Sequence, residues 1–198
     1  MSNRIWSRAL VSAALLAGCG DSTPPGPEPE GSDDGLTVAE SRTLMALLAG
    51  LGVDDSDSLP EPPEVPLTIA CPGGGTALVD GMISTEESEG RADLEVDVEI
   101  ELRDCVLMGD GVTFVLAAAE LEQAGTGWWT VDGLEFTTEV FLRMAGEFSF
   151  DVGDRRGSCS ADFEHLRRIG TEHDYQHVIR KGRICGHDVD MEVLGPIP

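Results

Sequence analysis

Residues 93–102 alternate strictly between acidic and apolar side chains, and this run constrains the fold more than any other feature of the chain. The acidic positions are Asp93, Glu95, Asp97, Glu99 and Glu101, and the apolar positions are Leu94, Val96, Val98, Ile100 and Leu102. Successive side chains of a β-strand point to opposite faces of its sheet. The run therefore predicts a strand with one buried face and one solvated face.

Further short strands are predicted from Thr76 to the end of the chain, separated by glycine-containing turns. They cover residues 76–83, 112–119, 128–131, 134–142, 147–152, 159–169 and 175–185. No strand is followed by a long helical pattern, so parallel βαβ units are not expected. We expect a mainly β domain over residues 67–198, built as an antiparallel sandwich or a partly closed barrel.

One short amphipathic helix is predicted ahead of the strands, over about residues 38–50. Thr37 and Glu40 have the spacing of a capping box, in which the hydroxyl and the carboxylate each bind a backbone amide at the helix start. Leucines follow at helical spacing, and glycines end the run. An acidic, proline-rich stretch comes next, so residues 36–66 are expected to hold the helix and a connector.

The N-terminus has the pattern of an export signal. Arg4 and Arg8 precede an apolar run, residues 9–17, that is too short for a permanent membrane span. The run ends in Leu16-Ala17-Gly18-Cys19, which resembles the lipobox of bacterial lipoproteins. That resemblance implies removal of residues 1–18 as a signal peptide and lipid on the sulfur and the amine of Cys19. An ordinary secretory signal or a short anchor helix is the alternative.

Residues 19–35 are then the lipidated start of the mature chain and its tether. Apart from Cys19 they comprise only Pro, Gly, Ser, Thr, Asp and Glu, a composition typical of a disordered spacer. Gly20 rather than Asp follows Cys19. In lipoprotein sorting, an Asp at this position favours retention in the inner membrane, so the resemblance favours the outer membrane. The sequence thus predicts a protein of the cell envelope, attached to a membrane by lipid.

Four further cysteines, Cys71, Cys105, Cys159 and Cys185, are an even number in a chain expected to be exported, which predicts two disulfides. If Ile169 pairs with Tyr175 in a hairpin, Cys159 lies directly opposite Cys185. Pairing the apolar side of residues 76–83 with that of 94–102 brings Cys71 within one residue of the position opposite Cys105. A bulge in the glycine-rich residues 72–75 would absorb the difference. A redox or metal site is the alternative, although no Cys-x-x-Cys motif is present.

Charge excludes one class of function. The chain holds 37 Asp and Glu against 13 Lys and Arg, a formal net charge of −24. Such a surface repels phosphates, so nucleic-acid binding is not expected. The carboxylates of residues 93–101 are interpreted as a solvated face rather than a Ca²⁺ site, because one strand cannot supply the six to eight oxygens that Ca²⁺ requires.

Neither a catalytic motif nor a cofactor site is found in the sequence. The glycines at 73–75 lack the Lys and Ser or Thr of a phosphate-binding loop, and no serine lies in a nucleophile elbow. The histidines, His165, His173, His177 and His187, all fall in the last third. His173 and His177 are four residues apart and could bind one ion only on a helix, because four residues along a strand separate side chains by about 13 Å. A surface hairpin is therefore favoured over a zinc site.

Two adjacent tryptophans, Trp128 and Trp129, are expected to point to opposite faces of a strand. An exposed tryptophan suits stacking on a sugar or anchoring an interface, whereas a loop or the helix covering it is the structural alternative.

Taken together, the export signal, the cysteines and the lack of a catalytic motif lead us to expect a lipid-anchored, non-catalytic binding or assembly module of the envelope, with a protein or a glycan as partner. A half-open barrel that carries an apolar ligand and an envelope hydrolase using carboxylates of the β face are the alternatives.

Overall fold

The computed structural model describes residues 35–51, 65–132, 135–170 and 175–196. One helix and eight strands make up this part of the chain. They are α1 (Val38–Ala49), β1 (Leu67–Ala70), β2 (Thr76–Ser88), β3 (Arg91–Gly109), β4 (Val112–Asp132), β5 (Glu135–Val152), β6 (Arg155–Gly170), β7 (Tyr175–Ile184) and β8 (His187–Pro196). The predicted signal peptide, the tether with Cys19 and most of the acidic connector lie outside the described residues.

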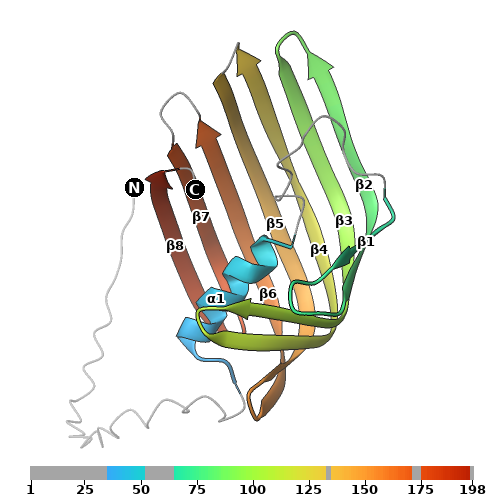
Figure 1. Cartoon of the computed structure of the whole chain (residues 1–198), viewed down its shortest axis with the longest axis vertical. Helices are drawn as coiled ribbons and strands as arrows, with labels where there is room; N and C mark the ends of the chain where they lie inside the picture. Colours follow the sequence, from blue (N-terminus) through green and yellow to red (C-terminus); the bar gives the residue numbers. More distant parts are fainter. Residues whose placement is uncertain (1–34, 52–64, 133–134, 171–174, 197–198) are drawn as a thin grey trace, which may run out of the picture. The chain divides into compact units, whose positions relative to one another are not determined.

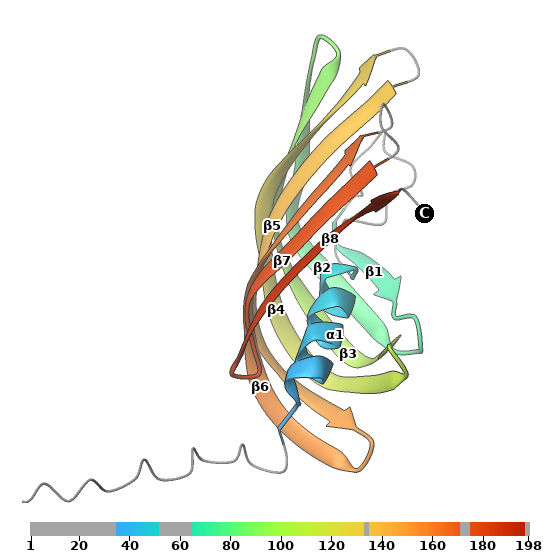
Figure 2. The ribbon, with the colours of Figure 1, turned by 90° about the vertical axis from the view of Figure 1, so that its left-hand side faces the viewer.

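The eight strands form a single antiparallel sheet in which each strand pairs with its neighbour in sequence, from β1 to β8 (Figure 1). The mainly β, antiparallel class is therefore confirmed. Within the described residues there is one sheet, not the two layers of a sandwich, and β1 and β8 do not close it into a barrel. The sheet curves, and α1 packs against its concave face, where a second sheet of a sandwich would lie (Figure 2).

The concave face holds the core, and we call it the inner face; the other is the outer face. On β3 the predicted alternation is confirmed, with every second residue from Ala92 to Leu102 buried. The largest fully buried apolar side chains are Leu44, Met45 and Leu48 of α1 together with Ile100, Leu102, Leu107, Phe114, Leu116, Met144, Phe163 and Ile184 of the sheet. Because helix and sheet share one core cluster, α1 is an integral part of the fold.

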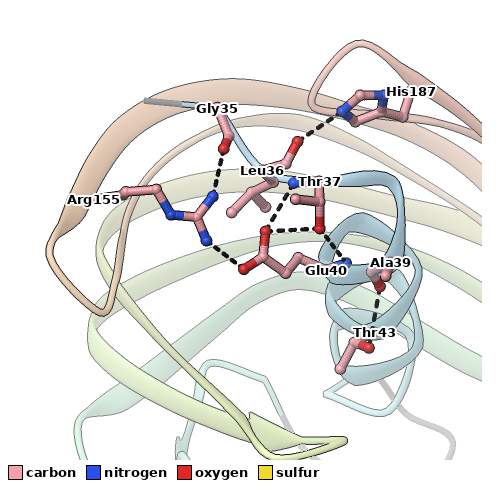
Figure 3. A network of polar contacts seen from close by, with 8 residues as sticks. All are labelled: Gly35, Leu36, Thr37, Ala39, Glu40, Thr43, Arg155 and His187. Carbon is pink, nitrogen blue, oxygen red and sulfur yellow. Dashed lines mark hydrogen bonds and ion pairs between the residues drawn. The ribbon is translucent and has the colours of Figure 1, made fainter. Parts of the chain in front are cut away.

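Helix α1 is fixed where it begins. The predicted capping box is present, with the Thr37 hydroxyl accepting from the Glu40 amide at 3.2 Å and the Glu40 carboxylate accepting from the Thr37 amide at 2.8 Å. Arg155, at the start of β6, donates to the carbonyl of Gly35 at 2.8 Å and forms an ion pair with Glu40 (Figure 3). Nε2 of His187, at the start of β8, lies 2.7 Å from the carbonyl oxygen of Leu36.

A third contact joins α1 to the turn between β3 and β4, where the Thr43 hydroxyl donates to the Asp110 carboxylate at 2.9 Å. The turns before β4, β6 and β8 lie at the same end of the sheet, because alternate hairpin turns of an antiparallel meander lie at the same end of the strands. One short helix thus fastens three hairpin turns to one another.

Glycine permits neighbouring strands to approach closely at two positions in the sheet. A Cβ atom on Gly146 would lie 2.2 Å from the carbonyl oxygen of Glu120 on β4, and Gly146 has a φ of 153°. Gly81 on β2 is similar, with a φ of 129° and the carbonyl oxygen of Asp97 at 2.4 Å. Any other residue at these positions would clash with the backbone of the adjacent strand.

Strand boundaries differ from the sequence prediction in two ways. The predicted strands 112–119 and 128–131 are parts of β4, and 134–142 and 147–152 are parts of β5. The glycines between them do not end the strands, because they lie where a neighbouring backbone passes closely, as Phe141 does beside Gly125. Strands β1 and β8 were not predicted.

Both predicted disulfides are formed. The Cα atoms are 5.5 Å apart in Cys71–Cys105 and 4.8 Å apart in Cys159–Cys185. The registers used to predict them were wrong. Cys71 follows β1 in the turn to β2, and the β2–β3 pairing is shifted by two residues from the predicted one. In the second hairpin Tyr175 pairs with Gly170 rather than Ile169.

The one-residue shift in the β6–β7 register keeps the apolar side chains of β7 in the core. A slip by one residue would turn the apolar side of β7 outward. In the observed register Ile184 pairs with Ala161, and both are buried. Cys185 then lies beyond the end of β7 with a φ of 50°, and its amide donates to the carbonyl of Ser160 at 2.9 Å. The turn after β7 therefore brings Cys185 to Cys159.

Candidate binding groove on the outer face

The outer face is divided into two regions of different charge balance. Over β5 to β8, acidic and basic side chains pair across the strands: Arg143–Asp162 at 2.9 Å, Arg183–Asp188 at 3.0 Å, Lys181–Asp190 at 3.7 Å and His177–Glu192 at 2.8 Å. Over β3 to β5, glutamates face one another instead, as Glu99 does Glu122 and Glu101 does Glu120. In the described structure Glu99, Glu120 and Glu122 form no ion pair, and only Glu101 has a basic partner, Arg103, so the second region carries an excess of negative charge.

A groove of about 510 Å³ runs over this acidic region, and Gly146 is part of its lining. Its carboxylates are Glu99, Glu101, Glu120, Glu122 and Glu147. Arg103 donates two hydrogen bonds of 2.8 Å to Glu101 and lowers the pKa of that carboxyl. Within the described residues no group of three or more His, Cys, Asp or Glu is placed to hold a metal ion.

A second groove, of about 460 Å³, lies nearer the β2–β3 turn and contains the half-buried ring of Trp128. We call it the Trp128 groove. Three strands contribute to it: its lining is Ser84, Thr85 and Glu86 of β2, Arg91, Asp93, Leu94 and Glu95 of β3, and Thr126, Gly127 and Trp128 of β4. The register explains this grouping, because Asp93 pairs with Glu86 on one side and with Trp128 on the other.

A cation of the chain lies over the indole. The guanidinium carbon of Arg91 is 4.8 Å from the centroid of the Trp128 ring, within the range of a cation–π interaction. Arg91 also donates to Asp93 through Nε at 2.9 Å and through an Nη at 2.6 Å. These hydrogen bonds lower the pKa of Asp93, which keeps its carboxylate ionised beside the ring.

The two adjacent tryptophans point to opposite faces, as predicted. Trp128 lies in the Trp128 groove on the outer face, and Trp129 packs against the core of the inner face. Both are half-buried, so neither is wholly covered. Sequence reasoning named the tryptophan pair without saying which ring lies on the outer face, and it missed Arg91, because the proximity of Arg91 to Trp128 depends on the pairing of β3 with β4.

The histidines are dispersed. His165 is buried on the inner face, His177 pairs with Glu192 on the outer face, and His187 binds the carbonyl of Leu36 beside α1. His173 lies outside the described residues. The described part of the chain therefore brings none of its three histidines together as ligands of one ion.

The disulfides bear on where the protein is found in the cell. Two disulfides suggest an oxidising, extracytoplasmic location. In the described residues no helix has the length and apolar character to cross a membrane. Comparison with known protein families, curated proteins and solved structures finds no match to this chain.

Proposed function

We propose that this protein is a lipid-anchored, non-catalytic binding module of the cell envelope that engages its partner through the outer face of the sheet. The observation that carries the proposal is the Trp128 groove, where a half-buried indole is surrounded by carboxylates, hydroxyls and a guanidinium. Tryptophan and arginine are the side chains most enriched where binding energy is concentrated in interfaces. A groove on the face opposite the core leaves this surface accessible to a large partner.

Attachment through Cys19 supports that role. Cleavage before Cys19 and its lipidation would leave residues 20–34 between the membrane and the point where Arg155 and His187 bind the backbone of Gly35 and Leu36, just before α1. Each buried methylene of an acyl chain contributes about 0.8 kcal/mol, so two or more chains anchor a protein stably. The glycine after Cys19 favours the outer membrane as the site of attachment.

Mass spectrometry of the native protein tests the anchor. We expect a mature N-terminus at Cys19 with acyl chains on it, and release of Cys19→Ala from the membrane fraction. An unmodified thiol, or a chain that still begins at Met1, would contradict the proposal.

Binding at the Trp128 groove is tested separately. Purified wild-type and Trp128→Ala proteins are immobilised and incubated with detergent-solubilised envelopes. Loss of specifically retained material in Trp128→Ala supports the proposal, and equal retention by both contradicts it.

A carrier function is the second candidate, favoured by one observation on the inner face. Gln123 is 2% exposed, and its Oε1 atom has no hydrogen-bond partner in the described part of the structure. A buried unpaired acceptor is costly and suits a ligand that donates to it. Native mass spectrometry of gently extracted protein tests this function: a co-purifying molecule with an apolar body and a hydrogen-bond donor that is lost in Gln123→Leu supports it, and a ligand-free mass contradicts it.

A further inference from the structure

We propose that the Trp128 groove binds an organic cation, that is, an ammonium or guanidinium group of a ligand, with the indole as platform and the surrounding carboxylates as counter-ions. This inference rests on the proposed function, since it names the ligand class of the same groove.

The ring is already used in this way by the protein. Arg91 lies over Trp128 at 4.8 Å and is held there by Asp93. The face of an aromatic ring carries negative electrostatic potential, which attracts a cation and offers no such gain to a neutral group. The side chain of Arg91 is 44% exposed, so it can move aside. Arg91 thus shows which chemical group the indole accepts, and it acts as a competitor that a ligand displaces.

The carboxylates around the ring outnumber this one cation. Glu86 and Asp93 are directly opposite each other on β2 and β3, and Glu95 is the next residue of β3 on the same face. In the described residues Arg91 pairs with Asp93, whereas no ion pair involves Glu86 or Glu95. Two carboxylates therefore remain to balance the charge of a ligand.

Charge also decides between a cation and the neutral sugar that an exposed tryptophan suggests. A neutral sugar would have to displace Arg91 from the indole. It carries no positive charge that could take the place of the guanidinium beside the carboxylates. A cationic ligand replaces the guanidinium with a group of the same sign. In addition, the net charge of −24 concentrates cations and repels anions near the surface. An anionic glycan is the least suited ligand of all.

The test titrates the purified full-length protein with tetramethylammonium chloride while NMR follows the indole N–H signals, with potassium chloride as the control for ionic strength. We expect a saturable shift of the Trp128 signal that potassium does not produce. Trp128→Ala should weaken binding measured by calorimetry by about fivefold, which corresponds to the ~1 kcal/mol of an exposed cation–π contact. A Lys-containing tripeptide is the second ligand, and tighter binding of it identifies a protein side chain as the source of the cation.

Two matched pairs of variants separate the groove from the general acidity of the face. Arg91→Ala and Arg103→Ala each remove one outer-face cation of β3 that pairs with an acid two residues away. Only Arg91 lies over the ring, so Arg91→Ala should tighten cation binding and Arg103→Ala should not. Likewise Glu95→Gln should weaken binding, whereas Glu147→Gln, in the other groove, should leave it unchanged.

Equal effects within either pair would overturn the inference, as would a neutral oligosaccharide that shifts the Trp128 signal when tetramethylammonium does not. That last result would leave the proposed function intact, because the groove would still bind a ligand. If, in addition, Trp128→Ala retains the same amount of envelope material as the wild-type protein, the proposed function fails together with the inference.

Discussion

Arg155 and Glu40 form an ion pair between the start of β6 and the first turn of α1, 115 residues apart in the chain (Figure 3). The Glu40 side chain is only 14% exposed, and its second oxygen accepts from the amide and the hydroxyl of Thr37. Arg155 also binds the carbonyl of Gly35, so the pair holds the chain at its entry into the fold. We call this pair and its backbone contacts the helix latch.

The first prediction concerns the stability that the helix latch provides. Glu40→Gln keeps the size of the side chain but removes its charge, and leaves the partly buried Arg155 without a counter-ion. We expect the free energy of unfolding in urea, with disulfides intact, to fall by about 1–3 kcal/mol. Arg156→Gln is the control, because Arg156 is 84% exposed and its ion pair with Asp151 is expected to contribute about 0–1 kcal/mol. Equal losses would contradict a special role of the latch.

The second prediction is the pH dependence of the same pair. Burial alone would raise the pKa of Glu40, but hydrogen bonds from Arg155 and Thr37 outweigh burial and lower it. The folded-state pKa thus lies below the unfolded one, so the contribution of Glu40 is fully present above the ordinary glutamate pKa of about 4.3. It is lost as the pH falls through the lowered folded-state value.

Urea unfolding at a series of pH values checks this dependence. The difference in stability between wild type and Glu40→Gln should be largest above about pH 5 and should shrink as the solution is made more acidic. A difference that stays constant down to the lowest pH at which both proteins fold would contradict the assignment. A difference that grows on acidification would reverse the sign of the shift.

Local patterns predicted the elements well because each pattern has one physical cause. Residues 93–102 alternate because one face is solvated, and Thr37 with Glu40 cap a helix in any context. The single layer could not be predicted, because the pattern of one strand does not show whether a sheet or a helix covers its apolar face. Helix α1 covers this face, and it is encoded far from the strands it contacts, β3, β7 and β8.

Glycine was the main source of error along the strands. The predicted strands were interrupted at residues 120–127 and 143–146, which contain Gly125 and Gly146, yet both glycines lie inside long strands where a neighbouring backbone approaches. A turn and a close approach use the same small residue, and only the paired strand distinguishes them. The Trp128 groove was beyond prediction for the same reason, since Arg91 and Trp128 meet only through the β3–β4 register.

The third prediction tests the close approach at Gly146. Gly146→Ala places a methyl group 2.2 Å from the carbonyl oxygen of Glu120, at a backbone φ of 153° that L-residues rarely adopt. We expect a loss of roughly 2 kcal/mol or more in thermal or urea unfolding. Gly195→Ala is the control, because a Cβ there meets nothing within 4 Å. A stability for Gly146→Ala equal to that of the control would contradict the close approach.

The fourth prediction compares the two disulfides. Cys71–Cys105 and Cys159–Cys185 join residues 34 and 26 positions apart, so the entropy of loop closure alone assigns each about 3–4 kcal/mol. They differ in burial, because Cys71 and Cys105 belong to the buried core whereas Cys159 and Cys185 pack at its edge. Replacing a buried pair with Ala leaves a cavity as well, so Cys71→Ala with Cys105→Ala should destabilise more.

Urea unfolding of the two double variants measures this difference, after peptide mapping under non-reducing conditions has verified the bridges in the wild-type protein. The map should join Cys71 to Cys105 and Cys159 to Cys185; a peptide that joins Cys71 to Cys159 would contradict the fold at its two fastened hairpins. If the Cys159 and Cys185 variant proves the less stable of the two, burial does not set the order. The turn after β7, where Cys185 holds a φ of 50°, would then depend on its bridge more than the core does.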